Sequence, residues 1–281
     1  LYFPPGTKVL GVFLFWFEVK KMFPKLRNSY KRISMINLHK YKYNVFSQNG
    51  EDGVIEKILE ISFHNKKMNT CEFGAGDIEK NSNTLNLIKK NQINYSIFIE
   101  KDEVLYKKLL NLKEKYNQII PYNLFVEFKD TSENTIDNIL KKNNIQNDID
   151  IMSIDIDSYD LDVYRSIKLY HPKLLIIESG RQKYGVLSEH SQHKQLNSFS
   201  SIYNVIKKKY YLIFYNGNLF FLNKTHFSEK HIKDNYYTDD EYQFLLHCIY
   251  HNYSKRGFFK KLLIDFLSKS KLLIKLIISY K

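Results

Sequence analysis

The sequence predicts an α/β protein with a mostly parallel seven-stranded sheet, helices on both faces and an antiparallel hairpin at the end. From about residue 68, short runs rich in isoleucine and phenylalanine alternate with amphipathic stretches, which is typical of parallel βαβ units. Near the end, Asn216-Gly217 separates two apolar runs, which favours a tight hairpin turn. The 281 residues are enough for one large domain with appendages.

The parallel part of the sheet follows from the order of these runs. Apolar runs that predict strands cover 69–73, 95–99, 118–126, 149–156 and 173–178. The intervening stretches predict helices at 82–91, from Asp102, at 134–142 and at 161–169. Right-handed crossovers join such units, and the loops at the carboxyl ends of the strands form the binding crevice.

The last part of the predicted sheet changes direction. Residues 198–209 predict a helix capped by Ser198, and 210–222 predict two antiparallel strands, because Asn216-Gly217 tolerates the positive φ angles of a tight turn. A parallel sheet that finishes with an antiparallel hairpin is the ending expected of a class I S-adenosylmethionine methyltransferase.

The two ends of the chain are predicted to be helical extensions, 1–40 and 228–281, around a methyltransferase domain at 41–227. The apolar run Val9–Phe17 is too short to span a bilayer, so we expect a buried or interfacial helix there. In 255–281, apolar residues recur at helical spacing among lysines. Such a helix can lie on an anionic membrane, pack on its own domain or pair with a partner helix. We expect a cytoplasmic protein, with attachment to the inner face of the membrane left open.

Charge and cysteine content narrow the class of protein. The formal net charge of +13 favours an anionic partner such as nucleic acid, a phosphorylated sugar donor or an acidic membrane. A lysine-rich composition explains the same charge without any partner. The two cysteines, Cys71 and Cys248, are far apart and outside any CxxC pair, which argues against a disulfide framework or a thiolate zinc site.

A glycine turn follows the first predicted strand, where residues 71–77 read CEFGAGD. Gly74 and Gly76 let the backbone approach a ligand closely, directly behind Glu72. A dinucleotide fingerprint would require a third glycine where Glu79 stands, and Asp77 and Glu79 would repel a pyrophosphate. S-adenosylmethionine carries no phosphate, and its sulfonium and amino groups are positive, so the acidic turn suits it.

Acidic residues also end the later strands. Glu100 ends the second strand, where a carboxylate can accept both ribose hydroxyls of an adenosine, or can cap the next helix. Asp155, Asp157 and Asp160 lie at and beyond the fourth strand, and Glu178 ends the fifth. Asp155 and Asp157 would face the same side if the strand persists that far. Clustered carboxylates repel, so we expect them to serve a cation, a shared proton or a general base rather than a solvated surface.

Six motifs taken together resemble the FkbM-like family of class I methyltransferases, over residues 43–222. The motifs are FSQNGEDGVIEKIL, CEFGAGD, NTLNLI, FIEKD, MSIDID and LLIIES, and a bacterial branch with an SQNGEDG–EFGAGDG–SIDIDGND–IEYN pattern is the most similar. The resemblance implies a Rossmann-like enzyme that methylates oxygen, often a sugar hydroxyl in polysaccharide or glycoconjugate pathways.

The resemblance also implies roles for individual residues. Residues 47–52, with Gln48 and Glu51, would form an entrance segment beside the donor. Asp155 and Asp157 would face the sulfonium and the acceptor. The remaining donor-binding residues would be Glu72, Gly74, Gly76 and Asp77 around the methionine portion, Asn83 and Thr84 nearby, and Glu100 on the ribose.

Two departures from the family pattern lie on the acceptor side. SIDIDGND becomes SIDIDSYD, so Ser158 and Tyr159 replace a glycine and an asparagine, and IEYN becomes IESG. A turn at 158 must therefore differ, or Ser158 must adopt a glycine-like conformation. Substrate choice transfers less well from the family than cofactor choice does.

The sequence leaves open three ways in which the acceptor hydroxyl could be activated. Asp157 is the first choice for the general base and Glu178 the second, beside Asp155. Asp157 and Glu178 could instead hold Mg²⁺, which lowers the pKa of a hydroxyl. His190 and His193 are a third possibility, although histidines in a polar loop are more often solvated.

Two other functions compete with sugar methylation. A basic chain with 20 phenylalanines and 22 tyrosines could methylate nucleic acid, but no Asp/Asn-Pro-Pro-aromatic motif is present and neither cysteine follows a proline. A non-catalytic, membrane-associated scaffold of a glycan-assembly complex is the other alternative, and the intact pair of Glu72 and Glu100 argues against it.

Overall fold

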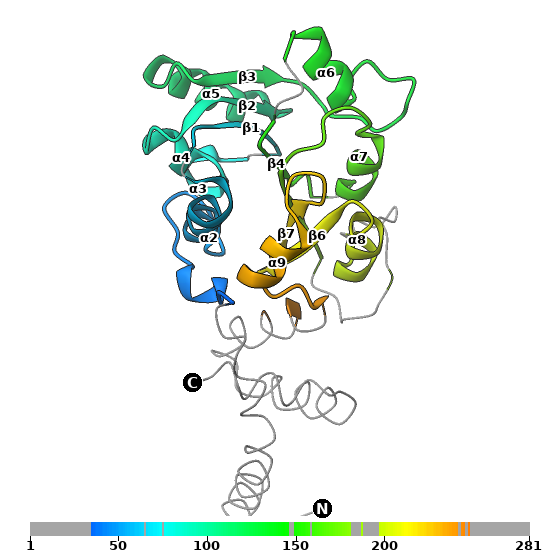
Figure 1. The fold of residues 1–281 in the computed structure, drawn as a ribbon. Helices are drawn as coiled ribbons and strands as arrows, with labels where there is room; N and C mark the ends of the chain where they lie inside the picture. Colours follow the sequence, from blue (N-terminus) through cyan, green and yellow to red (C-terminus); the bar gives the residue numbers. More distant parts are fainter. Residues whose placement is uncertain are drawn as a thin grey trace, which may run out of the picture. The chain divides into compact units, whose positions relative to one another are not determined.

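Runs of isoleucine, leucine and phenylalanine form one seven-stranded sheet in the computed structural model of the chain (Figure 1). These runs are apolar on both faces of the sheet, which is the pattern of strands covered by helices on both sides. The structure describes residues 35–64, 66–74, 76–145, 149–157, 159–180, 187, 197–240, 243, 244 and 247.

The strand order is β3-β2-β1-β4-β5-β7-β6. The first five strands of the chain pair in parallel, whereas β7 runs antiparallel to both β5 and β6. This arrangement confirms the predicted fold class, a mostly parallel sheet that ends in an antiparallel hairpin. The strands are β1 (Met68–Phe73), β2 (Ile93–Glu100), β3 (Ile119–Asn123), β4 (Ile151–Ile154), β5 (Leu174–Glu178), β6 (Tyr210–Tyr215) and β7 (Asn218–Asn223).

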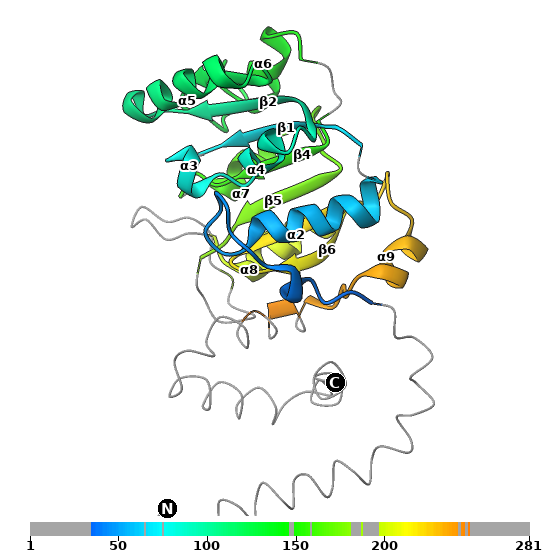
Figure 2. The same ribbon diagram turned by 90° about the vertical axis from the view of Figure 1, so that its left-hand side faces the viewer.

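Helices cover both faces of the sheet, as Figures 1 and 2 show from two directions. Side chains of α2, α4, α5 and α9 join one buried apolar cluster, and those of α6, α7 and α8 join the other. The helical elements are η2 (Leu38–Tyr41), α2 (Glu51–Ile58), the π-helical turn η3 (Leu59–Phe63), α3 (Ile78–Asn81), α4 (Leu85–Lys89), α5 (Glu103–Lys115), α6 (Ile136–Lys142), α7 (Asp160–Ser166), α8 (Phe199–Ile206) and α9 (Glu229–Asn235).

Strand alternation decides which residues meet which layer. In β5, Leu174 and Ile176 face the α2 layer, whereas Leu175 and Ile177 face the α7 and α8 layer. The next residue, Glu178, therefore faces the α2 layer. The face of the sheet that carries α2 is thus the face to which Glu178 contributes its carboxylate.

Local signals set the helix starts as the sequence predicts. The Asp102 carboxylate accepts hydrogen bonds from two backbone N–H groups of the first turn of α5. The Ser198 hydroxyl accepts one from the Ser201 N–H at the start of α8. Both caps satisfy donors that a helix leaves free at its N-terminus.

The hairpin turn lies at the predicted position, but of Asn216 and Gly217 only the glycine has a positive φ. Gly217 has φ 116°, which glycine adopts without strain, and the Asn216 N–H donates to the Asn218 carbonyl over 3.1 Å. This turn brings Asn216 and Asn218 to the edge of the sheet where β5 ends, because β7 begins opposite Glu178.

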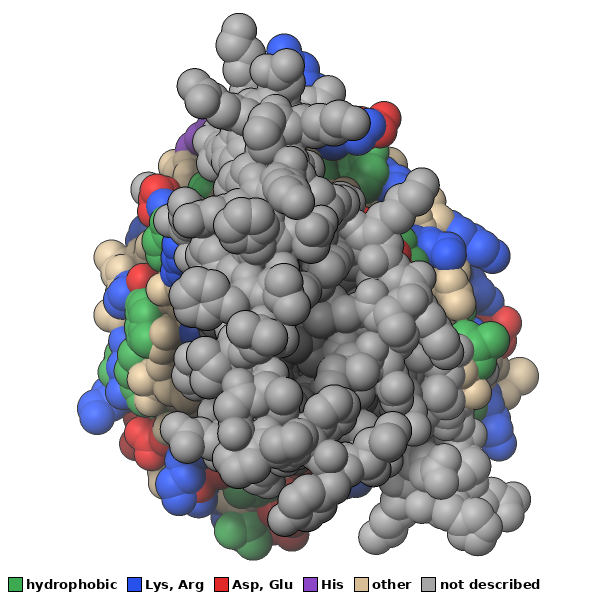
Figure 3. Space-filling view, turned by 90° about the horizontal axis from the view of Figure 1, so that it is seen from below, with side chains coloured by type: hydrophobic (Ala, Val, Ile, Leu, Met, Phe, Trp, Pro, Cys, Tyr) green, Lys and Arg blue, Asp and Glu red, His purple; other side chains and the backbone are tan. Residues whose placement is uncertain are grey.

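The charges on the surface and the two chain ends matter for the predicted anionic partner and the predicted membrane contact. In the view of Figure 3, lysine and arginine side chains recur around the described rim of the molecule with carboxylates between them. Among the described residues, no helix has both the length and the apolar character needed to cross a bilayer. The run Val9–Phe17 and the basic stretch 255–281 lie outside the described residues, so the domain boundaries and the membrane contact stay predictions.

Candidate active site

Residues from five strands form one row at the edge of the sheet where the parallel strands end. Glu100 and Glu178 are the last residues of β2 and β5, and Asn218 is the first of β7. Gly74 and Asp155 follow β1 and β4 directly. We call Glu100, Gly74, Asp155, Glu178 and Asn218 the edge row.

Backbone hydrogen bonds establish this alignment. The Gly74 N–H donates to the Ile99 carbonyl and the Asp155 N–H donates to the Phe73 carbonyl, each over 3.2 Å. Both bonds continue the parallel pairing for one residue beyond β1 and β4. On the far side, Glu178 lies directly opposite Asn218 in the antiparallel pair.

Glycine is required in the edge row because the backbone of the fourth strand passes beside it. A Cβ atom on Gly74 would lie 1.6 Å from the Asp155 carbonyl oxygen, and Gly74 has φ 77°. Any side chain at this position would therefore displace the backbone of Asp155. Gly76, with φ 54°, donates its N–H to Glu100 Oε2 over 3.1 Å.

Glu100 closes this turn from the second strand. Its Oε1 accepts the Asp102 N–H over 2.8 Å, while Oε2 accepts the Gly76 N–H. A carboxylate has about four lone-pair sites, so both oxygens retain capacity for hydroxyl donors. Its predicted contact with a ribose stays a prediction.

Glu72 is engaged by the protein itself. Its side chain is 2% exposed, and its two oxygens accept four hydrogen bonds from Ser82, Asn83 and Thr84. Burial raises the pKa of Glu72, and these hydrogen bonds oppose that shift. The Asn83 amide also donates to Ser153 Oγ of β4 over 2.9 Å. Glu72 therefore holds the loop before α4 in place, and its predicted contact with the methionine portion of the donor stays a prediction.

Asp155, Asp157 and Glu178 form an acidic cluster. Each can offer one carboxylate oxygen such that the three oxygens lie within 4.8 Å of one another. Burial raises the pKa of Asp155 well above its ordinary value, and the charges of Glu178, Asp160 and Asp157 raise it further.

The reason for this convergence differs from the predicted one. The strand β4 ends at Ile154, so alternation along a strand does not align Asp155 with Asp157. Asp157 instead has φ 61°, the left-handed conformation that aspartate tolerates better than most residues. Its side chain is exposed, contrary to the expectation that solvent would not reach these carboxylates. Ser158 lies outside the described residues.

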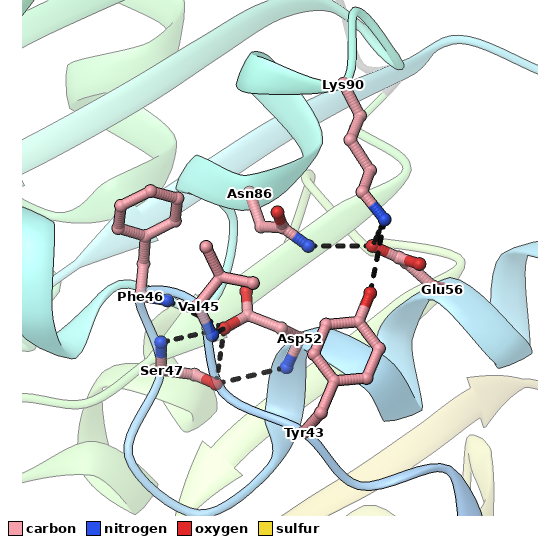
Figure 4. Close-up of polar contacts among 8 residues, drawn as sticks. All are labelled: Tyr43, Val45, Phe46, Ser47, Asp52, Glu56, Asn86 and Lys90. Carbon is pink, nitrogen blue, oxygen red and sulfur yellow. Dashed lines mark hydrogen bonds and ion pairs between the residues drawn. The ribbon is translucent and has the colours of Figure 1, made fainter.

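The segment before α2 is folded around Asp52. Asp52 Oδ2 accepts the backbone N–H groups of Val45, Phe46 and Ser47 and the Ser47 hydroxyl, at 2.7–2.9 Å (Figure 4). Farther along α2, Glu56 contacts Asn86 and Lys90 of the α4 region. These contacts attach both the segment and α2 to the side of the sheet that Glu178 faces.

The predicted entrance residues have different surroundings. Glu51 is 1% exposed, and its carboxylate accepts hydrogen bonds from Asn216, Asn218 and the Asn49 N–H. Gln48 is exposed. Asp77 lies apart from the edge row and pairs with Lys108 over 3.0 Å and with Lys80 over 3.4 Å.

Some functional candidates were missed by the sequence analysis, and others cannot be placed. Asn216 was assigned only to the turn and Asn218 only to the following strand, although an asparagine on each side of Gly217 could have indicated a side-chain role. Ser82 and Ser153 carried no signal in the sequence. His190, His193 and Cys248 lie outside the described residues.

Two surface depressions among the described residues contain no member of the edge row. One of about 610 Å³ lies between η2 and α2, with Tyr41, Tyr43 and Glu56 in its lining. The other, of about 510 Å³, lies along α5 beside Lys108. The chemistry of the edge row, and not the depth of these depressions, identifies the candidate site.

Comparisons with known proteins bear on the fold. No protein-family model and no curated protein matches the chain. The CurJ carbon methyltransferase is similar in structure, with 12% identity over 66% of this chain and 57% of that one and a TM-score of 0.42. An Aquifex aeolicus SAM-dependent methyltransferase has 13% identity, coverages of 67% and 99% and a TM-score of 0.40. TrmK of M. capricolum, solved with S-adenosyl-homocysteine, has 11% identity, coverages of 75% and 93% and a TM-score of 0.37.

The scope of these likenesses is limited to the arrangement of the fold. This chain spans little more than half the length of CurJ, at 57%, and 50% of the citrinin polyketide synthase CMeT domain. The fold class of this chain rests on the strand order of its own sheet. The resemblance to the FkbM-like branch stays a prediction.

Proposed function

We propose that this chain binds S-adenosylmethionine and transfers its methyl group to a hydroxyl, most specifically a sugar hydroxyl of a polysaccharide or glycoconjugate precursor. The observation that carries the proposal is the edge row with its acidic cluster, in which Gly74 lies between Glu100 and Asp155. A cationic donor fits an edge where carboxylates gather and where a glycine lets the backbones of neighbouring strands approach closely. The motif resemblance adds the sugar acceptor.

The donor end of the proposed site is the turn at Gly74 and Gly76. Glu100 already accepts one N–H of this turn and retains lone pairs toward the adjacent space, which supports its assignment to the ribose hydroxyls. Burial raises the pKa of Asp155, and the negative charges of Glu178, Asp160 and Asp157 on one side of this turn raise it further. That negative charge would favour a sulfonium on the Asp155 side of Gly74.

The acceptor end is the acidic cluster. In the proposed reaction the acceptor oxygen attacks the methyl carbon, the carbon–sulfur bond breaks, and its electron pair stays on sulfur as S-adenosylhomocysteine forms. Asp157 takes the hydroxyl proton, because its exposed carboxylate is open to an incoming acceptor. Glu178 and Asp155 lie beside it in the acidic cluster, close enough to accept that proton next. Alignment of the three reacting atoms supplies the rest of the rate enhancement.

The same cluster fits a divalent cation. Three carboxylate oxygens within 4.8 Å form the oxygen-only donor set that Mg²⁺ prefers, and Asp157 and Glu178 would be its ligands. When bound, such a cation would lower the pKa of the acceptor hydroxyl.

The test has a binding arm and a turnover arm. Calorimetry with S-adenosylhomocysteine should show saturable binding by the full chain, and no affinity would favour the non-catalytic scaffold. Transfer of labelled methyl groups should be assayed on a panel of sugars, nucleotide sugars and RNA, with and without Mg²⁺. Methylation of RNA alone would favour the nucleic-acid alternative.

Asp157→Asn should lower turnover by about 10²–10⁴-fold and leave the affinity for S-adenosylhomocysteine unchanged. Asp130→Asn, at another exposed aspartate, is the matched control and should leave both unchanged. Full turnover of Asp157→Asn would assign the base to another residue.

A further inference from the structure

We propose that Asn216 and Asn218 are positioning residues that hold Glu51, and with it segment 44–50, at the acceptor end of the edge row. We call these two asparagines the amide clamp. The inference rests on the proposed function, because it assigns the clamp a role in ordering the entrance to that site.

The amide clamp saturates one oxygen of a buried carboxylate. Glu51 Oε1 accepts the Asn216 Nδ2 group over 3.0 Å and the Asn218 Nδ2 group over 3.2 Å. Glu51 Oε2 accepts the Asn49 N–H over 2.7 Å. Removal of a clamp amide would leave the charge of Glu51 under-solvated in a site that is 1% exposed.

The clamp also holds the backbone of the segment. Asn216 Nδ2 donates to the Asn49 carbonyl over 3.1 Å, so one amide contacts both Glu51 and the residue two positions before it. At the other end of the segment, Lys89 Nζ of α4 lies 4.0 Å from the Phe46 ring centroid. Segment 44–50 therefore spans from α4 to the β6–β7 turn, and Figure 2 shows this dark-blue stretch on the side where the parallel strands end.

The geometry of the sheet brings Glu51 to the acidic cluster. Asn218 lies directly opposite Glu178, and side chains of opposed residues in an antiparallel pair point to the same face. Because Asn218 contacts Glu51, the Glu51 carboxylate is a neighbour of Glu178 on that face. The segment anchored by Glu51 consequently borders the space in front of Asp155, Asp157 and Glu178.

The chemistry of the clamp fits positioning better than stabilisation. Replacement of a buried charged contact by well-packed apolar groups is often neutral or stabilising, so a fold has little reason to bury Glu51 here for stability alone. Lys42 lies close enough for its charge to act on Glu51, but the amides of Asn216 and Asn218 make the hydrogen bonds to Glu51 Oε1. Neutral amides satisfy the carboxylate and leave the local charge unchanged.

The test replaces one clamp amide with a carboxylate. Asn218→Asp places a like charge against Glu51, so amide hydrogen exchange of 44–50 should accelerate at least tenfold. The affinity for S-adenosylhomocysteine should fall about tenfold. Asn223→Asp is the matched control, since Asn223 ends the same strand, is equally buried and lies at the opposite edge of the sheet. It should leave the exchange of 44–50 and the affinity unchanged.

A reversed pair distinguishes positioning from general damage. When Glu51→Gln is combined with Asn218→Asp, the new amide at 51 can donate to the new carboxylate at 218 while its oxygen accepts the Asn49 N–H. The amide nitrogen at 51 then faces the Asn216 Nδ2 donor, so this double variant should recover part of the exchange protection and affinity that Asn218→Asp loses. If Asn218→Asp does not fold, Asn216→Ala removes three hydrogen bonds without added charge and should accelerate the same exchange.

The outcomes separate the two proposals. Unchanged exchange of 44–50 in both Asn218→Asp and Asn216→Ala would overturn the clamp. Equal losses in the single and the reversed double variant would also overturn it, because the two positions would then act independently. Absence of S-adenosylhomocysteine binding by the unaltered chain would overturn the proposed function, while the exchange measurements still test whether the clamp orders the segment.

Discussion

Glu72 and Asp155 are carboxylates on neighbouring strands, on the same face and near the same edge of the sheet, yet their surroundings are opposite. Glu72 is surrounded by donors, since Ser82, Asn83 and Thr84 give it four hydrogen bonds. Asp155 is surrounded by acids, and burial together with the charges of Glu178, Asp160 and Asp157 raises its pKa.

This difference separates a structural carboxylate from a functional one. A buried carboxylate that accepts several hydrogen bonds links the segments that supply the donors, and its loss leaves those donors unsatisfied. A carboxylate among other carboxylates raises the free energy of the folded state at neutral pH, so a fold gains nothing from it until a cation or proton enters. The acidic cluster is therefore the stronger candidate for chemistry, although the sequence motif drew equal attention to Glu72.

The largest expected effect on stability comes from Glu72. Glu72→Ala removes all four hydrogen bonds and leaves the Thr84 and Asn83 donors buried, so the free energy of unfolding should fall by about 3–5 kcal/mol. Urea denaturation measures the loss. Glu79→Ala, at an exposed site in the same loop region, is the control and should change stability by less than about 0.5 kcal/mol. If the two substitutions lowered stability equally, Glu72 would have no special structural role and would not differ from the acidic cluster in that respect.

An effect of opposite sign is expected at Asp155. The raised pKa of Asp155 means that the folded chain binds its proton to a higher pH than the unfolded chain, whose aspartates titrate near about 3.9. Stability is therefore lost as pH rises from about 4 through the raised pKa. Asp155→Asn removes this loss, so the variant should be more stable than the unaltered chain by about 0.5–2 kcal/mol at pH 7.

The pH profile provides the decisive comparison for Asp155. The gain in stability should shrink toward zero as the pH falls well below about 3.9, where the aspartate of the unaltered chain is protonated in both the folded and the unfolded state. Glu114→Gln, at an exposed position of α5, should give a profile parallel to that of the unaltered chain. A variant that is destabilised at pH 7 would mean that the acidic cluster stabilises the fold instead of straining it.

The smallest expected effect concerns Asp77, which the motif groups with the donor-binding residues. Lys108 lowers the pKa of Asp77, and both side chains are partly exposed, so Asp77→Asn should cost no more than about 1 kcal/mol in stability. The cost should fall in high salt because the ion pair is screened. Calorimetry with S-adenosylhomocysteine shows whether Asp77 also contacts the donor, since a surface ion pair alone would leave affinity unchanged.

The sequence by itself determined how strands and helices alternate along the chain from β1 to β7. It also determined the cap at Ser198, the position of the turn at Gly217 and the acidic ends of β2 and β5. These features follow from local patterns, because strand periodicity, capping and turn chemistry act over a few neighbouring residues. The tertiary structure alone decided that Glu72 is occupied by residues 82–84, that Asp157 reaches the acidic cluster through a left-handed residue, and that Asn216 and Asn218 hold Glu51. Each of those outcomes depends on which segments become neighbours in space, and short-range patterns in the chain carry no information about donors that arrive from 10 to more than 160 residues away.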